Sequence, residues 1–216
     1  MFSVRVVIIA LLACVWVLIA QTKAPPADGL IVPGVRVGPV TKQSTEASLV
    51  RQFGPSAAAR EVDITIDGRE RATVFYNQDP KRKLIVVWNE ESPSHPSRVY
   101  LCHGLSENTC VWRTVRGIRE NLTIKELERR NKRAFSMTTW GPEDGGWVIS
   151  WEGGNLEAEL QGVSIRLIPR EDSQGNFLPR LTKDETDFAS LEGVRSSANP
   201  IIQKLNPRVG SIIVKF

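Results

Sequence analysis

A short capped helix followed by a run of strand-like segments occurs twice in this sequence, and this recurrence constrains the fold more than any other feature. Thr45 and Thr123 each begin a segment with Leu four residues later and Arg two residues after that. Thr123 and Glu126 form a capping box, because each side chain accepts a hydrogen bond from an otherwise free backbone amide. Gly54 and Pro55 then end the first helix.

Segments with strand periodicity follow each helix. The predicted strands are residues 62–66, 72–76 and 84–88 after the first helix, and residues 134–140, 147–151 and 156–168 after the second. Asp67-Gly68 is a hairpin signal between the first two. The sequence therefore predicts an α+β fold of duplicated helix-plus-three-stranded-antiparallel-meander units. An irregular C-terminal extension with a short helix at 184–191 ends in a strand at 211–216.

The domain organisation follows from composition along the chain. Residues 21–29 are rich in proline and have no periodicity, as is typical of a linker. A unit of one helix and three strands has a thin core alone, so we expect the two sheets to pack together or join edge to edge. The predicted divisions are an export signal or membrane anchor (1–20), the linker (21–29), the first repeat (30–115) and the second repeat with its extension (116–216).

The N-terminus carries the pattern of an export segment. Residues 6–20 are an unbroken apolar run, and Arg5 stands directly before them. Three outcomes remain open: cleavage after Ala24, retention as an anchor that is short for a span of roughly 30 Å, or lipidation of Cys14 in a lipobox-like context. We expect the protein to be exported, either to the periplasm or tethered to a membrane through residues 6–20 and facing the periplasm.

Two of the three cysteines lie outside the export segment, at Cys102 and Cys110. In an oxidising compartment this even count predicts one disulfide closing a small loop. A zinc site of Cys102, His103 and Cys110 lacks a fourth nearby ligand, and adjacent residues of an extended chain point in opposite directions. Free thiols are the remaining alternative.

The low histidine content and the small net charge of the chain argue against several classes of function. The chain has only two histidines, which leaves little for multi-histidine metal sites or a general base. The formal net charge is +4, and Arg5 and Lys23 contribute to it, so the remainder is near neutral and predicts no nucleic-acid partner. No glycine cluster precedes a helix in the pattern of a phosphate-binding loop, so we expect no cofactor.

Candidate catalytic residues have simpler interpretations. His95 lies in a proline-rich loop, and the chain has no nucleophile elbow. Glu143 and Asp144, with Glu152 across the hairpin, can form an acid–base pair or a Ca²⁺ site, but these residues are also typical of a polar turn. His103 stands beside Cys102 and is expected on the surface. We therefore predict no catalytic residues, no metal and no enzymatic activity.

Two basic clusters, residues 81–83 and 129–133, can meet anionic lipid headgroups or an acidic partner. The alternative is a solvated turn for the first cluster and a solvated helix end for the second. Cations near a helix C-terminus also interact favourably with the helix dipole, which gives the second cluster a structural reason.

Tryptophans provide the candidate binding face. Trp147 and Trp151 are four residues apart in a predicted strand and therefore share a face. With Trp140 they can form an exposed aromatic surface for a protein or glycan, flanked by glycines that permit close approach. Core packing of a two-layer sheet is the alternative interpretation of the same three residues.

Residues 31–40, followed by Thr45, Leu49 and Phe53-Gly54, resemble a family of uncharacterised exported bacterial proteins, and the resemblance covers most of residues 30–216. The second half contributes GIRENLTIKELERRNKRAF, WGPEDGGWVISWEGGNL and NPIIQKLNP. At the fold level, the helix-plus-meander unit resembles small outer-membrane lipoproteins that assist β-barrel assembly and, distantly, tandem-repeat β-lactamase-inhibitor proteins. This resemblance implies a protein-binding scaffold without catalytic residues, although a fold alone does not fix a function.

Together these patterns predict a non-enzymatic cell-envelope module that binds or assembles protein partners. The alternative is a small-ligand or glycan binder that uses the face containing Trp140, Trp147 and Trp151. The partner and the oligomeric state are left open by the sequence.

Overall fold

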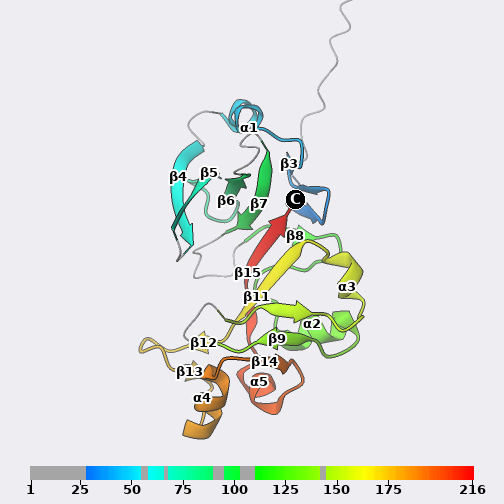
Figure 1. The fold of residues 1–216 in the computed structure, drawn as a ribbon, viewed down its shortest axis with the longest axis vertical. Coiled ribbons are helices and arrows are strands. Elements are labelled where there is room, and N and C mark those ends of the chain that lie inside the picture. Colours follow the sequence, from blue (N-terminus) through cyan, green and yellow to red (C-terminus); the bar gives the residue numbers. More distant parts are fainter. Residues whose placement is uncertain (1–27, 55–57, 66–67, 90–94, 103–109, 142–144) are drawn as a thin grey trace, which may run out of the picture.

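The computed structural model describes residues 28–54, 58–65, 68–89, 95–102, 110–141 and 145–216 (Figure 1). Helices and several sheets are both present, with more strand than helix, which confirms the mixed α+β class. The helices are α1 (Glu46–Phe53), α2 (Ile124–Asn131), α3 (Leu156–Glu159), α4 (Lys183–Ser190) and α5 (Pro200–Leu205).

A six-stranded sheet dominates the fold, and all of its neighbouring strands are antiparallel. Its order is β11 (Val163–Ile168), β15 (Arg208–Lys215), β7 (Pro96–Leu101), β6 (Leu84–Trp88), β5 (Gly68–Phe75) and β4 (Ala58–Thr65). The strands β4, β5 and β6 form the meander predicted after the first helix. Because β15 and β11 join β7, this sheet combines strands from both predicted repeats.

Three smaller sheets surround the large one. A four-stranded sheet has the order β3 (Val40–Thr41), β2 (Arg36–Val37), β1 (Leu30–Val32), β8 (Arg113–Thr114), and β1 pairs with β8 in parallel. A three-stranded sheet has the order β10 (Val148–Ser150), β9 (Ser136–Thr138), β14 (Val194–Ser196). A hairpin of β12 (Arg170–Glu171) and β13 (Phe177–Leu178) completes the set.

Side-chain caps fix the starts of the three eight-residue helices. Thr45 caps α1 with Ser48, and Thr123 caps α2 with Glu126, each in a reciprocal capping box. The same arrangement begins α4, where Thr182 is the N-cap. These contacts satisfy backbone amides that have no partner within the helix. The two helix starts predicted from sequence are therefore confirmed, as is the short helix expected at 184–191.

The second predicted meander is not formed as expected. Residues 156–159 are helix α3, so a single strand over 156–168 is wrong, and β11 begins only at Val163. Leu156 and Leu160 are both buried, and a spacing of four residues places two side chains on one face of a helix as well as on one face of a strand. Strand β9 pairs with β10 and β14, whereas β11 pairs with β15. The duplication is therefore not confirmed by the strand pairing.

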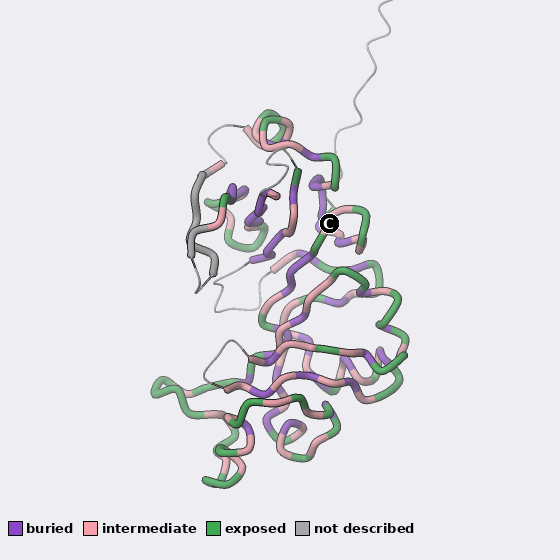
Figure 2. Tube along the Cα trace, viewed as in Figure 1, coloured by how far each residue is buried: buried purple, intermediate pink, exposed green. Residues whose placement is uncertain are grey.

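Buried positions run along the central strands of the large sheet (Figure 2). The sheet divides the buried residues into two groups. On β6, Leu84, Val86 and Trp88 lie in the main core, which extends from Ile31 to Val214. The alternate residues of β6, Ile85 and Val87, face the other side of the sheet. They belong to a smaller buried cluster with Ala72, Val74, Tyr100 and Ile213. This period-two separation gives the sheet a second face that the main core does not cover.

The predictions for the N-terminus fall on residues 1–27, which lie outside the described part of the chain. The export segment, the fate of Cys14 and the linker therefore stay predictions. Among the described residues, no helix is long and apolar enough to cross a membrane.

Candidate binding groove on the second face of the large sheet

The second face of the large sheet carries a hollowed strip of polar and aromatic side chains. A cavity of about 320 Å³ lies on this face, and a second, of about 400 Å³, lies at the ends of the strands, where Trp88 of the main core also lines it. Arg98 lines both cavities, so they are adjacent, and we call them together the groove. Strand β7 positions Arg98 and Tyr100 toward the groove, because its alternate residues Val99 and Leu101 belong to the main core.

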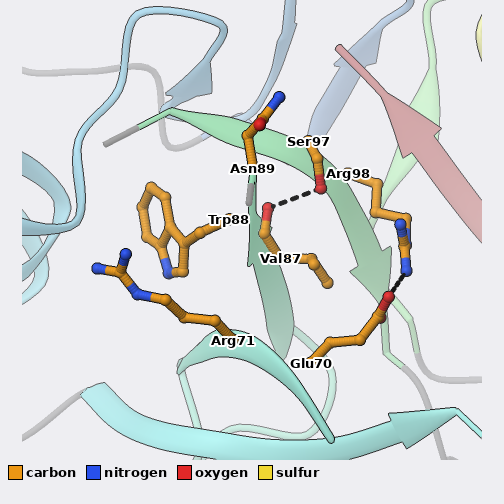
Figure 3. Close-up of a pocket in the computed structure, with 7 residues that line it drawn as sticks. All are labelled: Glu70, Arg71, Val87, Trp88, Asn89, Ser97 and Arg98. Atoms are coloured by element: carbon orange, nitrogen blue, oxygen red, sulfur yellow. Dashed lines mark hydrogen bonds and ion pairs between the residues drawn. The ribbon is translucent and has the colours of Figure 1, made fainter. Parts of the chain in front are cut away.

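The larger cavity lies where β5, β6 and β7 come together at one end (Figure 3). Its lining residues are Glu70, Arg71, Val87, Trp88, Asn89, Ser97 and Arg98. In Figure 3, Arg71 and Trp88 stand on one side of the cavity and the Glu70–Arg98 pair on the other. The floor is fixed by Ser97, whose hydroxyl donates to the Val87 carbonyl at 3.3 Å.

Arg98 is the most firmly held cation of the groove. Its Nη2 donates to Glu70 Oε1, and its Nε donates to the Tyr100 hydroxyl at 3.2 Å. Burial alone lowers the pKa of Arg98, but the hydrogen bonds that its guanidinium donates to Tyr100 and Glu70 outweigh this effect, so the pKa is raised. The guanidinium therefore stays charged and oriented.

One polar atom of the larger cavity is left without a partner. Glu70 Oε2 is buried and has no hydrogen bond, although Oε1 of the same carboxylate pairs with Arg98. A buried acceptor without a donor is costly to the fold. Arg71 is 53% exposed and lies 3.5 Å from Glu46, which leaves most of its guanidinium accessible.

The smaller cavity adds aromatic surface and a second cation. It is lined by Arg98, Tyr100, Trp147, Ser164, Ile213 and Lys215. Lys215 is exposed, and its ammonium has no ion pair with any described residue. Trp147 is half-buried, and the Arg166 guanidinium carbon lies 5.9 Å from its ring centroid. The groove thus combines basic groups with three aromatic side chains, Trp88, Tyr100 and Trp147.

The three tryptophans of the predicted binding face lie in different surroundings. Trp151 is only 6% exposed and packs against Phe135, with ring centroids 4.9 Å apart. Trp140 is half-buried, and its indole Nε1 donates to the Leu167 carbonyl at 2.7 Å. Only Trp147 of the three lines a described cavity of the groove. The face predicted from four-residue spacing therefore reduces, in this structure, to Trp147.

Glycines near the tryptophans are explained by packing within the chain. A Cβ added to Gly146, whose φ is 90°, would overlap the Leu167 carbonyl and the Trp140 ring. A Cβ on Gly145 would overlap the Thr139 carbonyl, and one on Gly154 would overlap the Asn131 amide. Close approach of backbone and side chains within the protein requires these glycines.

Other candidate residues from the sequence show no assembled site. His95 is exposed, and its carbonyl accepts from the Asn89 amide at 2.9 Å. Glu152 accepts from the Ser136 hydroxyl at 2.6 Å, and hydrogen bonds from Ser136 and Ser150 lower its pKa. Its proposed partners Glu143 and Asp144 lie outside the described residues, as does His103.

Residues of both basic clusters make hydrogen bonds that stabilise the fold. The carbonyls of Lys81, Arg82 and Lys83 accept hydrogen bonds from Val111, Trp112 and Cys102. In the second cluster, Lys132 is the left-handed C-cap of α2, and Arg133 donates to the Glu152 carbonyl. These contacts give both clusters a role in the fold.

Cys102 and Cys110 form the predicted disulfide, with Cα atoms 5.8 Å apart. Because both sulfurs take part in this bond, neither can be a thiolate ligand of a metal while the disulfide is formed. Sequence reasoning missed the side chain next to them: a carboxylate oxygen of Glu120 and the two Sγ atoms lie within 4.8 Å of one another. No spacing in the sequence relates Glu120 to the cysteine pair.

No protein-family model, curated protein or solved structure matches this chain.

Proposed function

We propose that this protein is a non-enzymatic binding module of the cell envelope, and that the groove binds an acidic segment of a partner protein. The observation that carries the proposal is the cavity pair around Arg98, in which oriented and accessible cations adjoin aromatic rings. Arginine, tyrosine and tryptophan are the residues that most often supply binding energy at protein interfaces.

The charge of the groove favours an acidic occupant. Arg71, Arg98 and Lys215 line it, and Glu70 is the single carboxylate among the lining residues. Arg98 already neutralises Glu70 Oε1, so an incoming carboxylate would meet the excess positive charge of Arg71 and Lys215. Such electrostatic complementarity raises association rates and selects partners, and it weakens as salt increases.

The envelope location is proposed from the sequence and supported by the disulfide. The apolar segment 6–20 behind Arg5 has the pattern of an export signal or anchor. A disulfide between Cys102 and Cys110 is compatible with an oxidising compartment. The resemblance to envelope scaffolds that bind proteins points in the same direction.

A small-ligand or glycan binder is the second candidate, favoured by one feature. In the smaller cavity, Trp147 and Tyr100 place aromatic rings next to the Ser164 hydroxyl, a combination that suits the apolar face and hydroxyls of a sugar. Such a ligand is uncharged, so its binding would not respond to salt. Salt dependence therefore separates the two candidates.

The test is quantitative affinity capture from an envelope fraction with purified full-length protein. We expect Arg98→Glu and Lys215→Glu to reduce capture of the bound protein at least tenfold, and raised salt to release it. Lys125→Glu, an exposed lysine of α2 outside the groove, has the same charge change and should capture like the wild type. Equal loss in all three variants, or capture that ignores salt, would contradict the proposal.

A further inference from the structure

The carboxyl of Glu120 lies beside the disulfide, and no described residue is its hydrogen-bond or ion-pair partner. Its oxygen and both cysteine sulfurs are mutually within 4.8 Å. No hydrogen bond or ion pair joins this carboxyl to any described residue. Removal from water raises the pKa of Glu120 to about 8, so the group is protonated at neutral pH. A partly buried carboxyl without partners is costly to the fold, which calls for a functional reason.

The two sulfurs of the disulfide are not equivalent. Cys102 is 1% exposed, whereas Cys110 is partly exposed. Cys102 Sγ lies 3.2 Å from the Lys81 carbonyl oxygen, which can accept a hydrogen bond from a reduced Cys102 thiol. An incoming thiolate therefore reaches Cys110, and Cys102 is the sulfur that leaves into a prepared hydrogen-bond site.

We propose that Cys102, Cys110 and Glu120 form a thiol–disulfide exchange site that accepts two electrons from a dithiol reductant, with Glu120 as the proton donor. A thiolate of the reductant bonds to Cys110 Sγ, and the Cys102–Cys110 bond breaks with its electron pair on Cys102 Sγ. The Glu120 proton passes to that sulfur, giving the Cys102 thiol and the Glu120 carboxylate. The second reductant thiolate then attacks the mixed disulfide and releases Cys110, which takes a proton from water. The reductant leaves as a disulfide.

Charged neighbours do not account for the state of Glu120. Desolvation is the only contribution to its raised pKa, and no charged side chain shifts it in either direction. Among the described histidine, cysteine and acidic side chains, Cys102 and Cys110 are the ones whose side-chain atoms cluster with its carboxyl. His103 and Glu107 belong to the segment between the cysteines and lie outside the described residues. The carboxyl oxygen lies within 4.8 Å of both sulfurs, and catalytic contacts of this kind commonly tighten only when a reaction partner is bound.

The test is the rate of reduction of the oxidised full-length protein by dithiothreitol between pH 6 and 9, divided by the concentration of reductant thiolate. We expect the wild-type rate constant to fall as pH passes through about 8, because Glu120 then loses the proton that it donates. Glu120→Gln should be about tenfold slower at pH 7 and should show no inflection. General acid catalysis by a positioned side chain is typically worth at least this much.

A control variant and a trapping experiment complete the test. Glu171→Gln, which neutralises an exposed carboxylate on β12, should match the wild type at every pH. If Glu120→Gln does not fold, the wild-type profile alone decides, since a rate constant without an inflection would overturn the proposal. Trapping with glutathione followed by mass spectrometry should place the mixed disulfide on Cys110, and an adduct on Cys102 would also overturn it. Neither result bears on binding in the groove.

Discussion

Arg98 on β7 and Glu70 on β5 form an ion pair across the intervening strand β6. Their side chains are 29% and 25% exposed, so water screens the pair only in part. The pair holds the guanidinium at the junction of the two cavities of the groove. The pair joins two strands that are separated by β6 in the sheet, and it defines the position where a ligand's charge would be recognised.

A double-mutant cycle of Arg98→Ala and Glu70→Ala should give a coupling of about 1 kcal/mol in the free energy of unfolding. Arg98→Ala alone should cost more, since it leaves Glu70 partly buried without its cation. The matched pair is Lys183 and Asp187 on α4, with side chains 85% and 59% exposed, and its coupling should be about 0.3 kcal/mol. Urea denaturation measures both cycles, and equal couplings would refute the distinction.

Alanine substitutions of Trp151 and Trp147 should have different effects on the free energy of unfolding and on partner binding. Trp151→Ala should lower the free energy of unfolding by about 3–5 kcal/mol, because it removes a buried ring packed on Phe135. Trp147→Ala should cost about 1–2 kcal/mol, since that ring is half-buried. Partner capture at a temperature where both variants are folded should fall for Trp147→Ala and stay unchanged for Trp151→Ala. The reverse pattern would place the binding face elsewhere.

Asn131 should be among the most sensitive polar residues of the described chain. It is 0% exposed; its Nδ2 donates to the Trp151 carbonyl at 2.9 Å, and its Oδ1 accepts from the Leu156 amide at 3.1 Å. Asn131→Ala leaves the buried Leu156 amide without its acceptor, whereas the Trp151 carbonyl keeps the Gly154 amide as a donor. The loss of these contacts should destabilise the protein by about 2–3 kcal/mol. Asn176→Ala removes exposed hydrogen bonds to Asp172 and should cost less than about 0.5 kcal/mol. Thermal unfolding measures both, and similar losses would contradict this account.

Glu120 should make the stability of the oxidised protein depend on pH. Its pKa is raised from 4.5 to about 8 in the folded state, so the folded chain keeps a proton that the unfolded chain releases. The resulting stability is fully present below pH 4.5 and is lost as pH rises toward about 8. Glu120→Gln should remove this loss, and its gain over the wild type should grow by about 2 kcal/mol across that window, the partial exposure of the group limiting the effect. A gain that does not change with pH would contradict the assignment.

The parts of the fold predicted from sequence are those determined by local interactions. The capping residues Thr45 and Thr123 set their helix starts through contacts three residues away. The unbroken apolar run of β6 indicated a strand buried on both faces. The failure at residues 156–168 is instructive. Leu156 and Leu160 are apolar at a spacing compatible with both a strand and a helix, and burial of both decided for a helix.

The groove and the Glu120 cluster could not be predicted in the same way. Arg98 meets Glu70 because β5, β6 and β7 are neighbours, and Lys215 joins them because β15 crosses from the other half of the chain to pair with β7. Trp147 and Trp151 separate because they flank the short strand β10, whose register shifts between Val148 and Ser150, and the period-two rule no longer holds across that irregularity. These relationships depend on long-range pairing, which residue spacing does not encode.

The most direct measurement is photocrosslinking in intact cells with a photoreactive amino acid at Ser164, which lines the groove. The matched control places the same residue at Ser173, an exposed serine that is not among the residues lining the groove. The account predicts a discrete protein adduct from position 164, none from position 173, and loss of the adduct when Arg98→Glu is introduced. Adducts of equal yield from both positions, or an adduct at 164 that survives Arg98→Glu, would contradict the claim that the groove binds an acidic protein partner.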